Sequence, residues 1–166
     1  MFERRFDGFL ISTDPSLLPL DDIWLGLSKT YWASGRSRET VERSIRHSTC
    51  FGLYDGERLA GFARVVSDRA TFAWLCDVFI NEAYRGRGLG KWLVEELMGH
   101  PDLQGLRRWL LATRDAHSLY ARHGFAPPHG PERWMEVYRS DPSVMGPQCQ
   151  DDVNVENGDG NADLSS

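Results

Sequence analysis

The chain has 166 residues, 41% hydrophobic and 26% charged, with a net charge of −5, which is the size and composition of one soluble globular domain. No apolar run approaches the roughly 20 residues of a membrane-spanning helix, and the N-terminal stretch lacks the apolar core of a secretory signal, so we expect a cytoplasmic protein without membrane contact. Its three cysteines, Cys50, Cys76 and Cys149, show neither the number of a disulfide framework nor the spacing of a zinc site. We therefore expect free thiols and no metal.

The negative charge gathers at the C-terminal end. Residues 141–166 contain six acidic residues and no lysine or arginine, so removing these six charges from the net −5 leaves +1 for the rest of the chain. This end is rich in Asn, Asp, Gly and Ser and offers little to bury, which predicts a folded domain over 1–140 and a disordered acidic tail over 141–166. A nearly neutral domain without a clustered basic face indicates no nucleic-acid partner.

The first half of the chain alternates between strand and helix patterns. Residues 6–12 predict a strand, 21–27 a short helix, and 37–47 a second helix with Ser37 as its N-cap. Residues 48–67 contain the pair Asp55-Gly56 between two alternating apolar runs, which is a strong signal for a β-hairpin.

The second half continues the alternation. Residues 71–80 are nearly all apolar and predict a strand buried on both faces, followed by a glycine-rich turn and an amphipathic helix over 89–97. A buried strand over 107–113, a helix over 115–124 and a last strand over 132–139 complete the order. Strand, two helices, three strands, helix, strand, helix and strand together predict one α/β domain.

The turn "YRGRGLGKWL" places three glycines on alternate positions directly before a helix. Exposed backbone N–H groups and the positive end of a helix favour an anion at this point, and Arg85 and Arg87 add charged donors. The alternative is structural: Gly86 makes the turn, while Gly88 and Gly90 let the helix pack closely on the sheet. The spacing is that of neither a dinucleotide fold nor a nucleotide-triphosphate loop.

Two motifs carry a family resemblance. The stretch "VFINEAYRGRGLGKWLVEELM" resembles the coenzyme A motif R/Q-x-x-G-x-G/A of the GNAT superfamily of N-acetyltransferases, with Arg85 first and Gly88 and Gly90 in the glycine places. Downstream, "DAHSLYARHGF" resembles the family's A-x-x-x-Y-x-x-x-G-F, in which Ala116 is the alanine, Tyr120 the tyrosine, and Gly124 and Phe125 the final pair. The resemblance implies an α/β (α+β) fold with a central mixed, mostly antiparallel sheet, whose fourth and fifth strands are parallel and splayed, flanked by helices.

The resemblance also implies acetyl-CoA as cosubstrate. In the family, backbone amides of the glycine-rich turn hold the pyrophosphate, and a bulged strand before it binds the pantetheine arm and polarises the thioester carbonyl. The matched tyrosine, Tyr120, commonly protonates the departing thiolate; its alternative is a residue that only packs on the sheet. Thr113 stands where the family often has an asparagine that contacts pantetheine. The implied cofactor residues are Val78, Phe79, Ile80, Arg85, Gly86, Arg87, Gly88, Leu89, Gly90, Thr113 and Ala116.

A protonated amine must lose a proton before it attacks, so a base or a water relay is needed. Asp77 is the charged residue of an otherwise apolar strand, and we expect it to bind the amine or to act as general base. The alternative is a carboxylate bonded to Arg64 or another strand neighbour. Asp115 is the weaker candidate, because its place at the start of a helix suits an N-cap.

The resemblance also implies that the loop between the first two helices walls the substrate pocket. Tyr31 and Trp32 could cage a cationic amine, although Trp32 could equally cap the core, whereas Arg36 would suit a carboxylate-bearing substrate. The sequence leads to an N-acetyltransferase that moves acetyl from acetyl-CoA to a primary amine of a small molecule by direct attack in a ternary complex. A non-catalytic acyl-CoA-binding module and a protein acetyltransferase remain alternatives, and a homodimer is left open.

Overall fold

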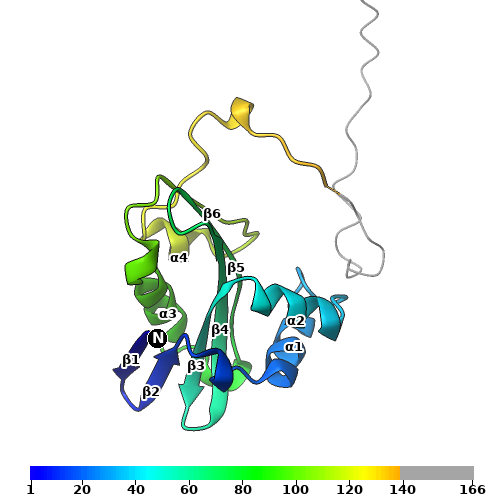
Figure 1. The fold of residues 1–166 in the computed structure, drawn as a ribbon, viewed down its shortest axis with the longest axis vertical. Helices are drawn as coiled ribbons and strands as arrows, with labels where there is room; N and C mark the ends of the chain where they lie inside the picture. Colours follow the sequence, from blue (N-terminus) through cyan, green and yellow to red (C-terminus); the bar gives the residue numbers. More distant parts are fainter. Residues whose placement is uncertain (139–166) are drawn as a thin grey trace, which may run out of the picture.

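The computed structural model describes residues 1–138, which form a six-stranded sheet in the order β1-β2-β3-β4-β5-β6 (Figure 1). The strands are β1 (Glu3–Phe6), β2 (Phe9–Ser12), β3 (Thr49–Asp55), β4 (Arg58–Ser67), β5 (Phe72–Ile80) and β6 (Arg108–Leu110). The first five are antiparallel, and β6 pairs with β5 in parallel. The helices are α1 (Leu20–Ser28), α2 (Arg38–Arg46), α3 (Leu89–Met98) and α4 (His117–Ala121).

The helices cover the two faces of the sheet in separate pairs, with α1 and α2 on one side and α3 and α4 on the other (Figure 1). Each pair closes its own core. Leu93 and Leu97 of α3 belong to the larger core with Phe51, whereas Ile23 of α1 and Val41 of α2 pack with the smaller core on the opposite face. Among residues 1–138, no helix is both long and apolar enough to cross a membrane.

The single strand expected over 6–12 is wrong, because the chain reverses within it. Asp7 and Gly8 have φ of 48° and 82°, two successive left-handed residues that turn β1 back into β2 with Phe6 opposite Phe9. This is the backbone pattern of a two-residue hairpin turn, which an Asp-Gly pair favours. The same dipeptide signal predicts the later hairpin at Asp55-Gly56.

The central predictions are confirmed. The Ser37 hydroxyl accepts a hydrogen bond from the Thr40 N–H at 3.2 Å and caps α2, whose Val41 is fully buried. Strands β3 and β4 form the predicted hairpin, with Asp55 paired to Arg58 and Gly56 at the turn.

Strand β5 is not buried on both faces as expected. Its Trp74 side is open, with Trp74 37% exposed and Cys76 half-buried, while Ala73 and Leu75 are fully covered. The reason is a gap in the helical cover on that face, which forms part of the cavity described below.

Three predictions for the C-terminal part of the domain need correction. Strand β6 covers three residues of the predicted 107–113 and is exposed or half-buried, because it is the edge of the sheet. Helix α4 is five residues long. Up to Tyr138 the expected strand over 132–139 is instead a short 3-10 turn, Pro131–Arg133, followed by unpaired residues that include the 97% exposed Met135. The predicted tail over 141–166 lies outside the described residues and stays a prediction.

Candidate active site

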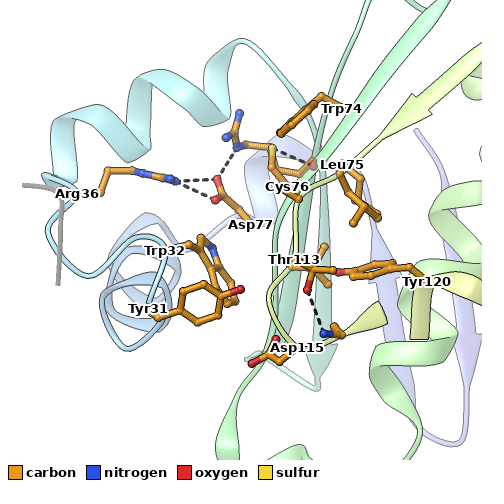
Figure 2. Close-up of a pocket in the computed structure, with 15 residues that line it drawn as sticks. Tyr31, Trp32, Arg36, Trp74, Leu75, Cys76, Asp77, Thr113, Asp115 and Tyr120 are labelled. Atoms are coloured by element: carbon orange, nitrogen blue, oxygen red, sulfur yellow. Dashed lines mark hydrogen bonds and ion pairs between the residues drawn. The ribbon is translucent and has the colours of Figure 1, made fainter. Parts of the chain in front are cut away.

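The two parallel strands separate after three residue pairs. Pairing of β5 with β6 ends at Trp74 and Leu110, and a cavity of about 460 Å³ opens beyond that point (Figure 2). Its walls come from β5, the segment after β6, the loop between α1 and α2, and α4. It brings together eight of the residues predicted from the sequence: Tyr31, Trp32, Arg36, Asp77, Val78, Thr113, Ala116 and Tyr120. Phe79 and Ile80 continue β5 beyond the cavity wall.

A β-bulge lies in the cavity wall at Asp77. The register of β4 against β5 shifts between Phe62 and Arg64, so that two residues of β5, Asp77 and Val78, oppose one residue of β4. Asp77 has a φ of 55°, in the left-handed region that glycine occupies in many bulges and that Asp tolerates better than most residues. The bulged strand expected from the family resemblance is therefore present. It turns the Asp77 side chain toward Arg64 and leaves Val78 packed on the larger core.

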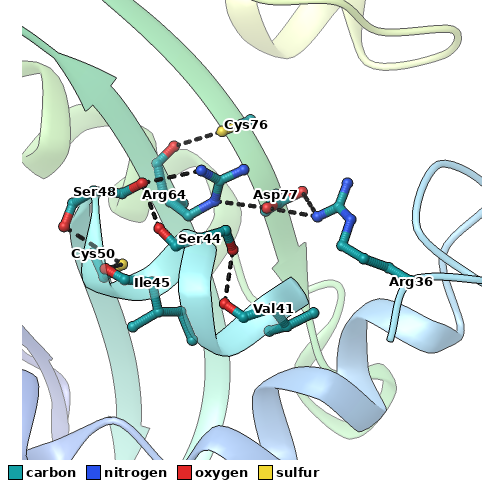
Figure 3. Close-up of polar contacts among 9 residues, drawn as sticks. All are labelled: Arg36, Val41, Ser44, Ile45, Ser48, Cys50, Arg64, Cys76 and Asp77. Carbon is teal, nitrogen blue, oxygen red and sulfur yellow. Dashed lines mark hydrogen bonds and ion pairs between the residues drawn. The ribbon is translucent and has the colours of Figure 1, made fainter. Parts of the chain in front are cut away.

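The Asp77 carboxylate is held by two arginines (Figure 3). Both of its oxygens accept from Nη1 of Arg36 at 2.9 Å, and Oδ2 also accepts from Nε of Arg64 at 2.7 Å. The Asp77 side chain is 2% exposed, and Nη1 of Arg64 donates to Oγ of Ser48 at 3.0 Å. The contact with Arg64 is the one named above as the alternative to catalysis. Both oxygens of this carboxylate are therefore already engaged in hydrogen bonds.

Tyr120 presents an unbonded hydroxyl to the cavity. The residue is 8% exposed and its ring packs edge-on against Phe125, yet within residues 1–138 the hydroxyl makes no hydrogen bond. Burial raises the pKa of Tyr120 to about 12, with smaller contributions of the same sign from Tyr31 and Asp115. A phenol with this pKa keeps its proton at physiological pH, so its O–H is available as a donor to a group bound in the cavity.

The aromatic pair at the mouth of the cavity binds a cation from the chain itself. Tyr31 and Trp32 meet edge to face with ring centroids 4.8 Å apart, and the Arg114 guanidinium lies 3.9 Å from the Tyr31 centroid. The backbone N–H of Arg114 also donates to the Tyr31 hydroxyl at 3.0 Å. One face of the expected amine cage is thus already occupied. No signal in the sequence linked Arg114 to Tyr31, because the two residues are 83 positions apart.

Asp115 is the other carboxylate on the cavity wall, and the N-cap role considered for it is wrong. Ala116 is the cap residue of α4, and its N–H donates to the Thr113 hydroxyl at 3.1 Å. Asp115 is exposed, lines the cavity and has no hydrogen bond or ion pair with the residues that the structure describes. Thr113, expected at the pantetheine, uses one oxygen lone pair on this turn and keeps its hydroxyl proton free.

The glycine-rich turn forms a row of free donors. Gly86 and Gly88 have φ of 78° and 77°, and Gly88 begins α3 as a left-handed cap. Throughout the described part of the chain, no backbone or side-chain acceptor meets the N–H groups of residues 86–91. An added Cβ at Gly88 would meet nothing within 4 Å, and one at Gly90 only Ile80 at 3.5 Å. Close packing is therefore not why these glycines are needed, and the turn fits a phosphate group.

The side chains of Arg85, Arg87 and Leu89 in this turn contact other parts of the protein. Nε of Arg85 donates to the Ile80 carbonyl at 3.2 Å, which ties the turn to the end of β5. The Arg87 guanidinium lies 6.0 Å from the ring centroids of Phe9 and Tyr84. Leu89 is buried in the larger core, so that only its N–H is available to a ligand. Among residues 1–138, no three His, Cys, Asp or Glu side chains gather as metal ligands.

The family model described as the acetyltransferase (GNAT) family matches residues 20–125, a stretch that contains the bulge, the glycine-rich turn and Tyr120. The chain belongs to this family. Membership makes it an acyltransferase, and the six-stranded sheet with its splayed parallel pair is the GNAT fold. The strands expected as the fourth and fifth are β5 and β6, because the first strand proved to be a hairpin.

Individual relatives agree with the family assignment. A GNAT-family structure from Xanthomonas campestris pv. campestris is 51% identical, with a TM-score of 0.78 over 81% of this chain and 96% of the other. A Gibberella zeae protein named as an acetyltransferase is 32% identical over 69% of this chain and 77% of its own length. A GNAT acetyltransferase from Elizabethkingia anophelis, solved with acetyl-CoA bound, shares the fold at 14% identity, with a TM-score of 0.56 over 81% of this chain and 90% of the other.

Proposed function

We propose that this GNAT protein transfers the acetyl group of acetyl-CoA to a primary amine of a small molecule, by direct attack while both substrates are bound. One observation carries the proposal: where β5 leaves β6, the largely buried Tyr120 places its hydroxyl at the cavity, and no group within residues 1–138 bonds that hydroxyl. A tyrosine that only packed on the sheet would not need a hydroxyl there, and a hydroxyl that reaches the cavity without a protein partner is free to bond a ligand.

The cosubstrate site would extend from the glycine-rich turn to the cavity. Acetyl-CoA supplies an activated acetyl thioester. The free N–H groups of residues 86–91 would bind its pyrophosphate, assisted by the positive end of α3. Within residues 1–138, the edge of β5 that faces β6 has no strand partner beyond Trp74, so the backbone of Val78, Phe79 and Ile80 would be available to the pantetheine arm.

Two side chains would move the protons. The Tyr120 hydroxyl would protonate the departing thiolate, since burial holds its pKa at about 12 and keeps the donor loaded. Asp115 would receive the proton of the attacking ammonium, directly or through a water, because it is the lining carboxylate without a cationic partner in the described chain. Asp77 is the less suitable base, because both of its oxygens are already hydrogen-bonded.

Direct attack is supported by the state of the lining thiol. Cys76 lines the cavity, and burial raises its pKa to about 11. A thiol that stays protonated at physiological pH is a poor nucleophile, so an acyl-cysteine enzyme has no support here. The contact of Tyr31 with Arg114 also closes one side of the cavity mouth, which suits a small acceptor better than a protein segment.

The test is release of free CoA thiol from acetyl-CoA with a panel of amines, compared between wild type and Tyr120→Phe. We expect kcat to fall by roughly 10- to 1,000-fold in the variant while acetyl-CoA still binds. Tyr54→Phe is the matched control, because the Tyr54 hydroxyl is bonded to the Leu17 carbonyl outside the cavity and its loss should alter stability rather than turnover. Tight acetyl-CoA binding without turnover on any amine would favour the binding-module alternative.

A further inference from the structure

The buried ion cluster of Arg36, Arg64 and Asp77 beside the cavity contains two positive charges and one negative charge. Arg36 and Arg64 share the single carboxylate of Asp77, and the remaining partner of Arg64 is the neutral Ser48 hydroxyl. Among residues 1–138 no second acid pairs with either arginine. Asp115, the other lining carboxylate, lies apart from this cluster, beyond Tyr31 (Figure 2). The end of the cavity near Arg36 is therefore cationic.

The uncompensated charge is accessible from the cavity. Arg36 contacts Asp77 through Nη1 alone, so its Nη2 and Nε have no acceptor within the described residues. Its side chain remains 20% exposed, that of Arg64 remains 13% exposed, and both line the cavity. The free donors of Arg36 form the planar edge that a guanidinium offers to a carboxylate.

Arg36 is held in place before any substrate binds. The backbone carbonyl of Arg36 accepts a hydrogen bond from Nε1 of Trp24 at 3.0 Å, which fixes the loop between α1 and α2 to α1. Asp77 then fixes the guanidinium, and the bulge aims Asp77 at it. A cation oriented in advance loses less entropy when it binds an anion.

We infer that the acceptor is an amino carboxylate, whose carboxylate group binds Arg36 at this end of the cavity while its amine lies toward Asp115 and Tyr120. The inference rests on the proposed function. Asp77 and Arg64 act as positioning residues for Arg36. The half-exposed indoles of Trp32 and Trp74 line the same space and suit an amino acid with an apolar side chain.

The experiment compares amino acids with the amines left when their carboxylate is removed: leucine with isopentylamine, and tryptophan with tryptamine. We expect wild type to favour the amino acid of each pair in kcat/KM by roughly 10- to 100-fold, and Arg36→Gln to reduce this ratio toward one, mainly through KM. Arg38→Gln is the matched control, because Arg38 pairs with Asp21 on the surface and does not line the cavity. Phosphoethanolamine against ethanolamine tests whether a phosphate is the preferred anion.

The outcomes separate this inference from the proposed function. Turnover that favours the decarboxylated amines, or a ratio unchanged in Arg36→Gln, would overturn the carboxylate site and leave the acetyltransferase intact. A stronger preference for phosphoethanolamine would replace the carboxylate by a phosphate and overturn the inference as stated. If nothing is turned over, calorimetric binding of N-acetylleucine against N-isopentylacetamide decides the carboxylate site without catalysis. The same wild-type comparisons decide it if Arg36→Gln fails to fold.

Discussion

Tyr120 combines a buried ring with an unbonded hydroxyl, and its pKa of about 12 makes a kinetic prediction. The phenol donates only when protonated, and it remains protonated well below that pKa. We therefore expect no loss of kcat attributable to Tyr120 between pH 7 and about pH 10. The measurement is the pH profile of kcat under saturating substrates. A falling limb near pH 9 that disappears in Tyr120→Phe would contradict the assignment.

Asp77 and Asp115 are two carboxylates that line one cavity, and replacing each by asparagine should affect different properties of the protein. Asp77→Asn removes the charge between two largely buried guanidiniums and should destabilise the fold by about 3 kcal/mol, measured by urea unfolding. Asp115→Asn, which removes an exposed and unpaired carboxylate, should shift stability by less than about 0.5 kcal/mol yet lower turnover. Equal stability losses in the two variants would argue against the ion cluster.

The glycine-rich turn allows a matched test at the scale of an element. Gly88 caps α3 with a φ of 77°, and Gly88→Ala should destabilise the protein by about 1–2 kcal/mol and weaken acetyl-CoA binding. Gly90 lies within the helix, where an added Cβ makes an ordinary contact with Ile80, so Gly90→Ala should be neutral or stabilising by up to about 1 kcal/mol. Thermal unfolding and calorimetric titration with CoA would reveal the difference. A more harmful Gly90→Ala would be unexpected.

At the element scale, the sequence was sufficient where a local signal decides the structure and insufficient where a distant partner decides it. The Ser37 cap and the Asp55-Gly56 hairpin depend on residues within a few positions, and both were predicted. Asp7-Gly8 carries the same local signal, but the apolar residues on both sides of it also fit one continuous strand. The apolar alternation after Pro131 predicts a strand, but a strand also needs a paired edge, which lies elsewhere in the chain.

The site shows the same division. One motif predicts the glycine-rich turn and the other predicts Tyr120, because each motif depends on residues a few positions apart. The pairing of Asp77 with Arg36 joins residues 41 positions apart, and the bulge that permits it depends on the register of β4. That Asp115 has no ion-pair partner among the described residues could likewise not be read from the sequence. Charge balance in a folded cavity depends on which side chains meet, and composition alone does not give it.

At the scale of the whole molecule, we expect the free energy of unfolding to fall at alkaline pH, because the fold covers two thiols and two phenols. Burial raises the pKa of Cys50, Tyr54 and Tyr120 to about 12 and that of Cys76 to about 11, from ordinary values of 9.0 for thiols and 10.0 for phenols. The unfolded chain releases these protons first, so stability is fully present below about pH 9 and declines as pH rises toward 12. Midpoints of thermal unfolding between pH 7 and 11 test this; Cys50→Ala should show a shallower decline.

The separation of β5 from β6 predicts the order in which the two substrates bind. A sheet that stops pairing at Trp74 and Leu110 leaves backbone groups in the gap whose natural partner is an extended chain, and the pantetheine arm of acetyl-CoA has that shape. The cosubstrate would then behave as a temporary strand, and the wall that receives the acceptor would be finished only after it is seated. Loading should slow amide hydrogen exchange along the second half of β5, and the enzyme should follow an ordered sequence in which the acyl donor enters first.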